Sequence, residues 1–157
     1  MAVIIQSDSA LYEVLHNRVF VTTFFGWFLA QNLKVFLGVV KEKRFNFKWF
    51  IGTGGMPSSH AAGVTALATS IGIQEGVGTA VFALSVLFAL IVISDAHGVR
   101  WSTGKQAEVL NKMLDDIYWG KTIKNDKLKE LIGHTPVEVI IGLLIGLTVA
   151  FTSYLVF

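Results

Sequence analysis

Four long, mostly apolar stretches dominate the sequence and limit what it can fold into: they cover residues 19–40, 57–73, 77–93 and 136–157. A run of about 20 apolar residues can cross the hydrocarbon core of a bilayer as an α-helix. The composition agrees, since 53% of the 157 residues are hydrophobic and 15% are charged, whereas soluble domains carry about 25% charged residues. We therefore predict an all-α integral membrane helical bundle with about four transmembrane helices, built as a single domain over residues 1–157.

Shorter interfacial or cytoplasmic helices are expected outside these spans, over residues 7–17, 107–114 and 128–132. The second and third spans are short for a hydrocarbon core of about 30 Å, so they would tilt or thin the bilayer locally. The second span is rich in Ala, Gly, Ser and Thr, and the fourth carries Gly142 and Gly146 one turn apart. Small residues let helices approach closely in lipid, so we expect the second span inside the bundle.

The cationic residues are distributed unevenly between the two sides of the predicted bundle. Of the 13 Lys and Arg residues, Arg18 falls on the side of both termini, Lys34 lies within the first span, and all the others fall in the loops 41–56 and 94–134. The positive-inside rule therefore places both long loops in the cytoplasm, although some of these cations could serve catalysis instead. The prediction is an integral protein of the cell (inner) membrane with its active site on the cytoplasmic side.

A glycine-rich loop runs directly into the second span, with the sequence Gly52-Thr53-Gly54-Gly55-Met56-Pro57-Ser58-Ser59-His60. Helix N-termini bind phosphate through unsatisfied N–H groups and the positive end of the helix dipole. Pro57 suits the first helical position, and Gly54 and Gly55 let backbone amides approach an anion. His60 can donate a proton near neutral pH. Beside apolar spans, this pattern points to a phosphate group carried on a lipid.

The fourth span begins with a second signal of this kind, at Gly133-His134-Thr135-Pro136-Val137-Glu138. Thr135 suits the N-cap and Glu138 the third helical position, which together make a capping box and are enough to explain Glu138. The same topology places His134 on the membrane face of His60. Glu138 is close enough in sequence to orient His134, whose imidazole can then attack phosphorus while His60 protonates the leaving oxygen.

These residues resemble the motifs of the divergent branch of the type 2 phosphatidic acid phosphatase family, which is related to the vanadium-dependent haloperoxidases. Pro57-Ser58-Ser59-His60 is similar to the P-S-G-H motif, with Ser59 in place of glycine. His134-x3-Glu138 resembles the end of the S-R-x5-H-x3-D motif, whose arginine falls at position 128, which is Leu. Lys34-x6-Lys41 resembles K-x6-R-P, with Lys for Arg and no proline. The divergent branch also has sequence signatures of its own, and three stretches resemble them: residues 95–100, 104–107 and 133–139.

The resemblance implies a lipid phosphatase that uses neither a metal nor another cofactor. His134 would be the nucleophile, His60 the general acid and Glu138 the group that orients His134. The implied phosphate ligands are Lys34, Lys41, Arg44, Ser58, Ser59, Arg100 and Lys105, supported by Gly54, Gly55, Asp95 and Gln106. The substrate would be a phospholipid or other lipid phosphate of the phosphatidylglycerophosphate or phosphatidic acid type, hydrolysed through a phosphohistidine. No nucleic acid partner is expected, and a homodimer could cover the site.

Several residues have a second interpretation. Lys34 could extend to the membrane interface, and Arg100 could pair with Asp95. His97 is interpreted as peripheral, but it is the rival nucleophile if His134 is misplaced. The pair Asp115-Asp116 could suggest a metal site, but the sequence has no second acidic cluster to support one. The alternative function is a catalytically silent bundle that binds a lipid or an anion.

Overall fold

The computed structural model describes residues 10–45, 55–117 and 133–156, with the side chains of 99–101 and 115–117 outside the description. After a short helix over 10–16, the elements are α2 (Arg18–Glu42), α4 (Ser59–Gln74), α5 (Ala80–Ser94), the π-helical turn η1 (Asp95–Val99), α6 (Arg100–Ile117) and α7 (Pro136–Val156). The described ranges contain helices and no strand. The predicted all-α membrane bundle is confirmed.

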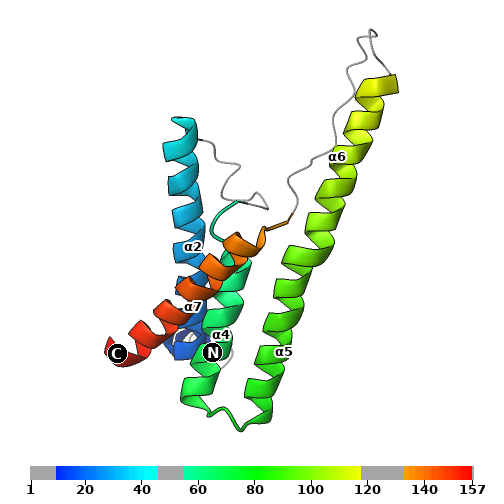
Figure 1. Ribbon diagram of the computed structural model, residues 1–157. Helices are drawn as coiled ribbons and strands as arrows, with labels where there is room; N and C mark the ends of the chain where they lie inside the picture. Colours follow the sequence, from blue (N-terminus) through cyan, green and yellow to red (C-terminus); the bar gives the residue numbers. More distant parts are fainter. Residues whose placement is uncertain (1–9, 46–54, 118–132, 157) are drawn as a thin grey trace, which may run out of the picture.

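Three helices are long and apolar enough to cross a membrane: α2, the continuous helix Ala80–Leu114, and α7. The predicted second span corresponds to α4, which has 16 residues and is therefore about 24 Å long. It is short for a hydrocarbon core of about 30 Å. Yet α4 is the centre of the bundle, because α2, α5 and α7 all pack against it (Figure 1). The architecture is three full-length candidate spans around one short helix.

The third predicted span, 77–93, corresponds to α5, but the helix does not stop there: α5 continues through η1 into α6 as one long rod (Figure 1). The change from apolar to polar residues at Asp95 marks the end of the apolar surface. It does not end the hydrogen-bonded helix, since no proline follows to interrupt it. The helix expected over 107–114 lies inside α6. The helix expected over 128–132 lies outside the described residues.

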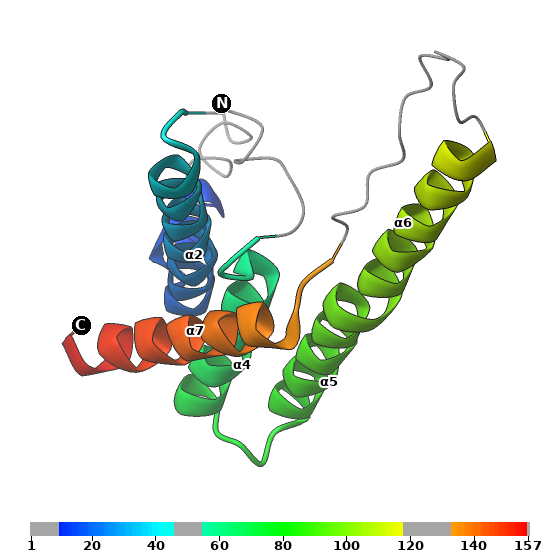
Figure 2. The ribbon, with the colours of Figure 1, turned by 45° about the horizontal axis from the view of Figure 1, so that its top comes forward.

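Small residues allow α4 to approach its neighbours closely, as predicted. A methyl group on Gly26 of α2 would lie 2.8 Å from Cβ of Ala66. Methyl groups on Gly142 and Gly146 of α7 would overlap backbone carbonyl oxygens of α4. Figure 2 shows α7 lying across α4 along this contact. Close packing of backbones therefore fixes how α7 is seated on α4.

The start of α2 and the end of α7 come together at one end of α4. The Arg18 guanidinium at the start of α2 donates to the carbonyl oxygen of Ser153 (2.8 Å) and lies 4.0 Å from the ring centroid of Tyr154. The Tyr154 hydroxyl donates to Oε1 of Gln74 at the end of α4 (3.0 Å). The start of α2 and the end of α7 therefore share one end of the bundle, and the starts of α4 and α7 meet at the other.

Candidate active site at two helix N-termini

The first wall of the site is the start of α4. Ser58 is its N-cap, and the Ser58 hydroxyl accepts the N–H of Ala61 (3.3 Å). Serine is a strongly preferred capping residue, so the helix begins at Ser59 and Pro57 lies just outside it. The prediction that Pro57 occupies the first helical position is therefore wrong. His60 becomes the second residue of the helix, and both serines are almost completely buried.

The second wall is the start of α7, where the predicted capping box is confirmed. The Glu138 N–H donates to Oγ1 of Thr135 (3.4 Å), and the Thr135 N–H donates to Oε2 of Glu138 (3.0 Å). The same carboxylate oxygen lies 3.2 Å from Nδ1 of His134. Glu138 thus both caps the helix and contacts the imidazole, while its catalytic role stays a prediction.

The two helix starts are joined by a hydrogen bond from the N–H of Ser58 to the carbonyl oxygen of Glu138 (3.0 Å). As a result, the rings of His60 and His134 lie with their centroids 6.5 Å apart and their planes at 56°. His134 is 3% exposed, whereas His60 is exposed. Two imidazoles that are far apart in the sequence therefore lie together at the positive ends of two helix dipoles.

The π-helical turn η1 holds His134 from another direction. The His134 N–H donates to the carbonyl oxygen of Ala96 (3.0 Å), and Nδ1 of His97 lies 3.2 Å from the carbonyl oxygen of His134. His97 is itself exposed and contacts the backbone of His134, so its interpretation as peripheral stays a prediction. π-helical turns occur often at functional sites, but the sequence signal for this one was only the run from Asp95 that resembles the family signature.

Lys34 of α2 completes the described polar cluster. It is 9% exposed, and a methyl group on Gly55 would lie 3.5 Å from its Cδ. Its charge interacts with that of Glu138. Lys34 therefore turns inward, and the alternative that it extends to the membrane interface is wrong. Gly55 has a φ of +85°, a conformation that favours glycine.

One buried polar residue beside Lys34 was not predicted as part of the site. Gln31 precedes Lys34 by one turn of α2 and is 4% exposed. Polar side chains within membrane helices are costly and usually functional. A glutamine one turn before Lys34, within a predicted membrane span, was the signal that could have identified it.

Other predicted phosphate ligands lie farther along the helices. Lys41 follows Lys34 by about 10 Å along α2, and Lys105 follows His97 by about 12 Å, given a rise of about 1.5 Å per residue. Arg44 forms an exposed ion pair with Glu42 (3.0 Å). The Lys105 ammonium forms another exposed pair, with Glu108 (2.7 Å). The structure thus brings Lys34 to the histidines and leaves these cations on the surface.

The remaining predicted residues are only partly described. Asp95 opens η1, and Gln106 is exposed on α6. Gly54, position 128 and the side chain of Arg100 lie outside the described residues. The roles of Gly54 and Arg100 and the Asp95–Arg100 pair therefore stay predictions. Within the described ranges, no group of three or more His, Asp or Glu side chains is placed to hold a metal ion.

Comparison with known proteins identifies two similarities. The model of the family described as "Divergent PAP2 family" matches residues 15–149, a region that contains His60, His134 and Glu138. The chain is also 37% identical over 146 residues to the "Uncharacterized membrane protein YuiD" of Bacillus subtilis (strain 168), covering 86% of this chain and 92% of that protein. No solved structure matches the chain.

Proposed function

Because the chain belongs to the Divergent PAP2 family, we propose that it is a lipid phosphatase that needs no metal ion. Its substrate would be a phosphomonoester of the phosphatidylglycerophosphate or phosphatidic acid type. The observation that carries this proposal is the placement of two imidazoles, 6.5 Å apart between ring centroids, with the Glu138 carboxylate on Nδ1 of one of them. This arrangement suits nucleophilic attack by one ring and proton transfer by the other.

In the first step, Nε2 of His134 attacks phosphorus and the bond from phosphorus to the ester oxygen breaks. His60, in its protonated form, donates a proton to the leaving alkoxide. The Glu138 carboxylate accepts a hydrogen bond from Nδ1–H of His134 (3.2 Å). This bond selects the tautomer with its lone pair on Nε2, and it stabilises the positive charge that the ring gains.

In the second step, water hydrolyses the phosphohistidine. His60, now neutral, accepts a proton from the attacking water as the P–N bond breaks, which returns His134 to its neutral form and releases inorganic phosphate. The Lys34 ammonium and the two helix N-termini supply positive charge for the equatorial oxygens in both steps. The buried position of Lys34, at 9% exposure, supports this role because electrostatic interactions strengthen away from water.

The cation distribution supports a cytoplasmic position for this site. A reporter domain fused after Phe157 is therefore expected outside the cytoplasm, because the start of α2 and the end of α7 share the end of the bundle opposite the histidines. Protease protection in sealed vesicles measures this, with a reporter inserted within residues 118–132 as the cytoplasmic control. A fusion after Phe157 that lies in the cytoplasm would contradict the orientation and the preference for substrates made there.

Vanadate is expected to inhibit phosphate release, because its five-coordinate adduct with an imidazole resembles the transition state of the first step.

Hydrolysis of phosphatidic acid in detergent micelles is also expected to continue at an unchanged rate in excess EDTA. Release of inorganic phosphate measures both effects. A rate that falls to background in EDTA and returns with Mg²⁺ would show that the mechanism is a different one.

Two observations favour a second candidate, a silent bundle that binds lipid phosphate without hydrolysing it. His134 is 3% exposed, and Glu138 has a sufficient structural role in the capping box. The measurement that separates the candidates is phosphate release beside phosphatidic acid binding. Binding with no turnover of any lipid phosphate would favour the silent bundle.

A further inference from the structure

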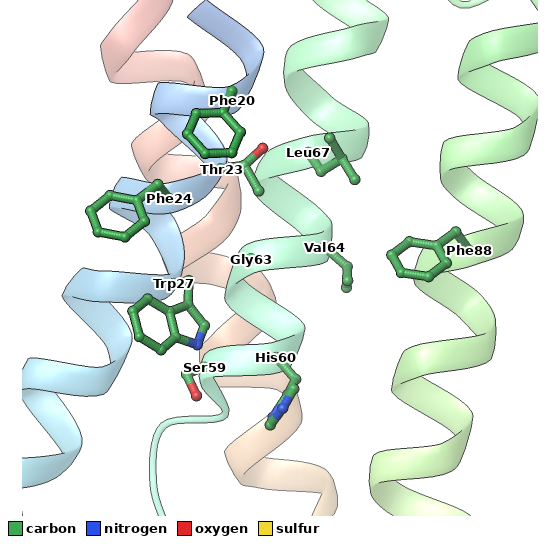
Figure 3. A pocket seen from close by; sticks show the side chains of 10 residues that line it. All are labelled: Phe20, Thr23, Phe24, Trp27, Ser59, His60, Gly63, Val64, Leu67 and Phe88. Carbon is green, nitrogen blue, oxygen red and sulfur yellow. The ribbon is translucent and has the colours of Figure 1, made fainter. Parts of the chain in front are cut away.

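An apolar groove leads away from His60 between α2 and α5. Ser59 and His60 line one end, and the groove then follows α4 towards Leu67, with a cavity volume of about 320 Å³ (Figure 3). The buried residues Gly63 and Val64 form its floor on α4. Gly63 has no side chain, and this keeps the floor low beside α2.

The sides of the groove are aromatic and open to the hydrocarbon of the membrane. Figure 3 shows Phe24 and Trp27 of α2 on one side and Phe88 of α5 on the other. These three side chains are only partly covered, with 49%, 39% and 50% exposure. Since α2 and α5 are parts of candidate membrane spans, a groove with such sides opens sideways towards lipid tails and not towards water.

We propose that this groove holds one acyl chain of the lipid phosphate whose head group is at His60 and His134. This inference rests on the proposed function and specifies its substrate: a lipid with a long chain close to its phosphate. Two features favour a chain from the substrate over a separate lipid. The groove shares His60 with the site, and Ser59 and His60 together form a polar end beside the histidines.

The dimensions of the groove agree with this occupant. From His60 to Leu67 the helix rises about 10 Å, which is about two-thirds of the ~15 Å that the chains of one leaflet occupy. A cavity of this volume falls within the usual range for small-molecule sites. A six-carbon chain would leave the end near Leu67 empty, whereas an eighteen-carbon chain, which is longer than the groove, would fill it and extend past Leu67.

The test fills the far end of the groove with a larger side chain. Leu67→Trp is expected to lower kcat/KM for dioleoyl phosphatidic acid about 10-fold and to change that for dihexanoyl phosphatidic acid less than about 2-fold. The matched control is Leu84→Trp, at a position that is 67% exposed on α5 and does not line the groove. In the control, both values are expected to stay within about 2-fold of wild type. Equal losses on both lipids in Leu67→Trp, with the control unchanged, would overturn the groove assignment.

A second measurement separates this inference from the proposed function. Phosphatidic acid with a diazirine midway along its acyl chain is photolysed on the intact protein, and the cross-linked residues are mapped by mass spectrometry. Cross-links concentrated on Phe20, Phe24 and Leu67 without any turnover would support the groove while contradicting the phosphatase. Turnover with cross-links spread over lipid-facing residues such as Leu84 and Leu144 would support the phosphatase and overturn the groove.

Discussion

Replacing His134 by alanine is expected to lower kcat/KM for phosphatidic acid at least about 10⁴-fold, because the step that forms the phosphohistidine loses its nucleophile. The measurement is release of inorganic phosphate from detergent-solubilised protein. His60→Ala is expected to lose less, about 10²- to 10³-fold, because water can replace a general acid in part. His16→Ala is the matched control, since His16 lies in the short helix over 10–16 and bonds the Tyr12 carbonyl oxygen there.

The same series distinguishes His134 from the rival nucleophile. His97 contacts the carbonyl oxygen of His134, so His97→Ala removes one hydrogen bond of about 0.5–1.5 kcal/mol and is expected to lower the rate about 10-fold or less. If His97 were the nucleophile, the order would be reversed. Full activity in His134→Ala together with complete loss in His97→Ala would reject the assigned mechanism.

Replacing Gly142 by alanine is expected to destabilise the bundle and to impair the site together. The new methyl group would overlap the Ser58 carbonyl oxygen, and overpacking of this kind costs about 1–3 kcal/mol. A loss of ~2 kcal/mol corresponds to a fall in the midpoint of thermal unfolding of ~4–8 °C in a chain of this size. The contact lies one turn after Glu138, so the separation of the two histidines should change as well and lower the rate about 10²-fold.

Gly78→Ala is the control for this effect, because a methyl group there would meet no atom within 4 Å. Its unfolding midpoint and its rate of phosphate release are expected to match those of the wild-type protein. An unchanged midpoint of thermal unfolding in Gly142→Ala would show that α7 does not pack against the start of α4 through Gly142. A lower midpoint with full activity would show that the distance between the helix starts does not matter for catalysis.

The helices, and the residues at their N-termini, could be predicted largely from local signals. Apolar length predicted α2 and α7 to within a few residues, and the capping box at Thr135 predicted the start of α7. The meeting of His60 and His134 followed from topology, since both lie at helix starts that reach the same end of the bundle. These inferences succeeded because they depend on short-range hydrogen bonding and on which end of the bundle a segment reaches.

Features that depend on tertiary contact could not be predicted in this way. The path of α5 through η1 beyond the apolar segment, and the contact of His97 with His134, arise from packing between segments far apart in the sequence. Pro57 was misplaced because two adjacent residues, Pro57 and Ser58, both suit a helix start, and the bond between Ala61 and the Ser58 hydroxyl decides between them. The groove beside Gly63 is likewise a property of three helices together.

Trapping the phosphorylated enzyme tests the central claim most directly. The protein is mixed with phosphatidic acid carrying ³²P in its head group and quenched in alkali, where phosphohistidine survives and acyl phosphates do not. Peptides are then mapped by mass spectrometry. The mechanism predicts a phosphoryl group on His134, absent in His134→Ala. Turnover with the label on another residue, or with no labelled protein at any time during turnover, would contradict it.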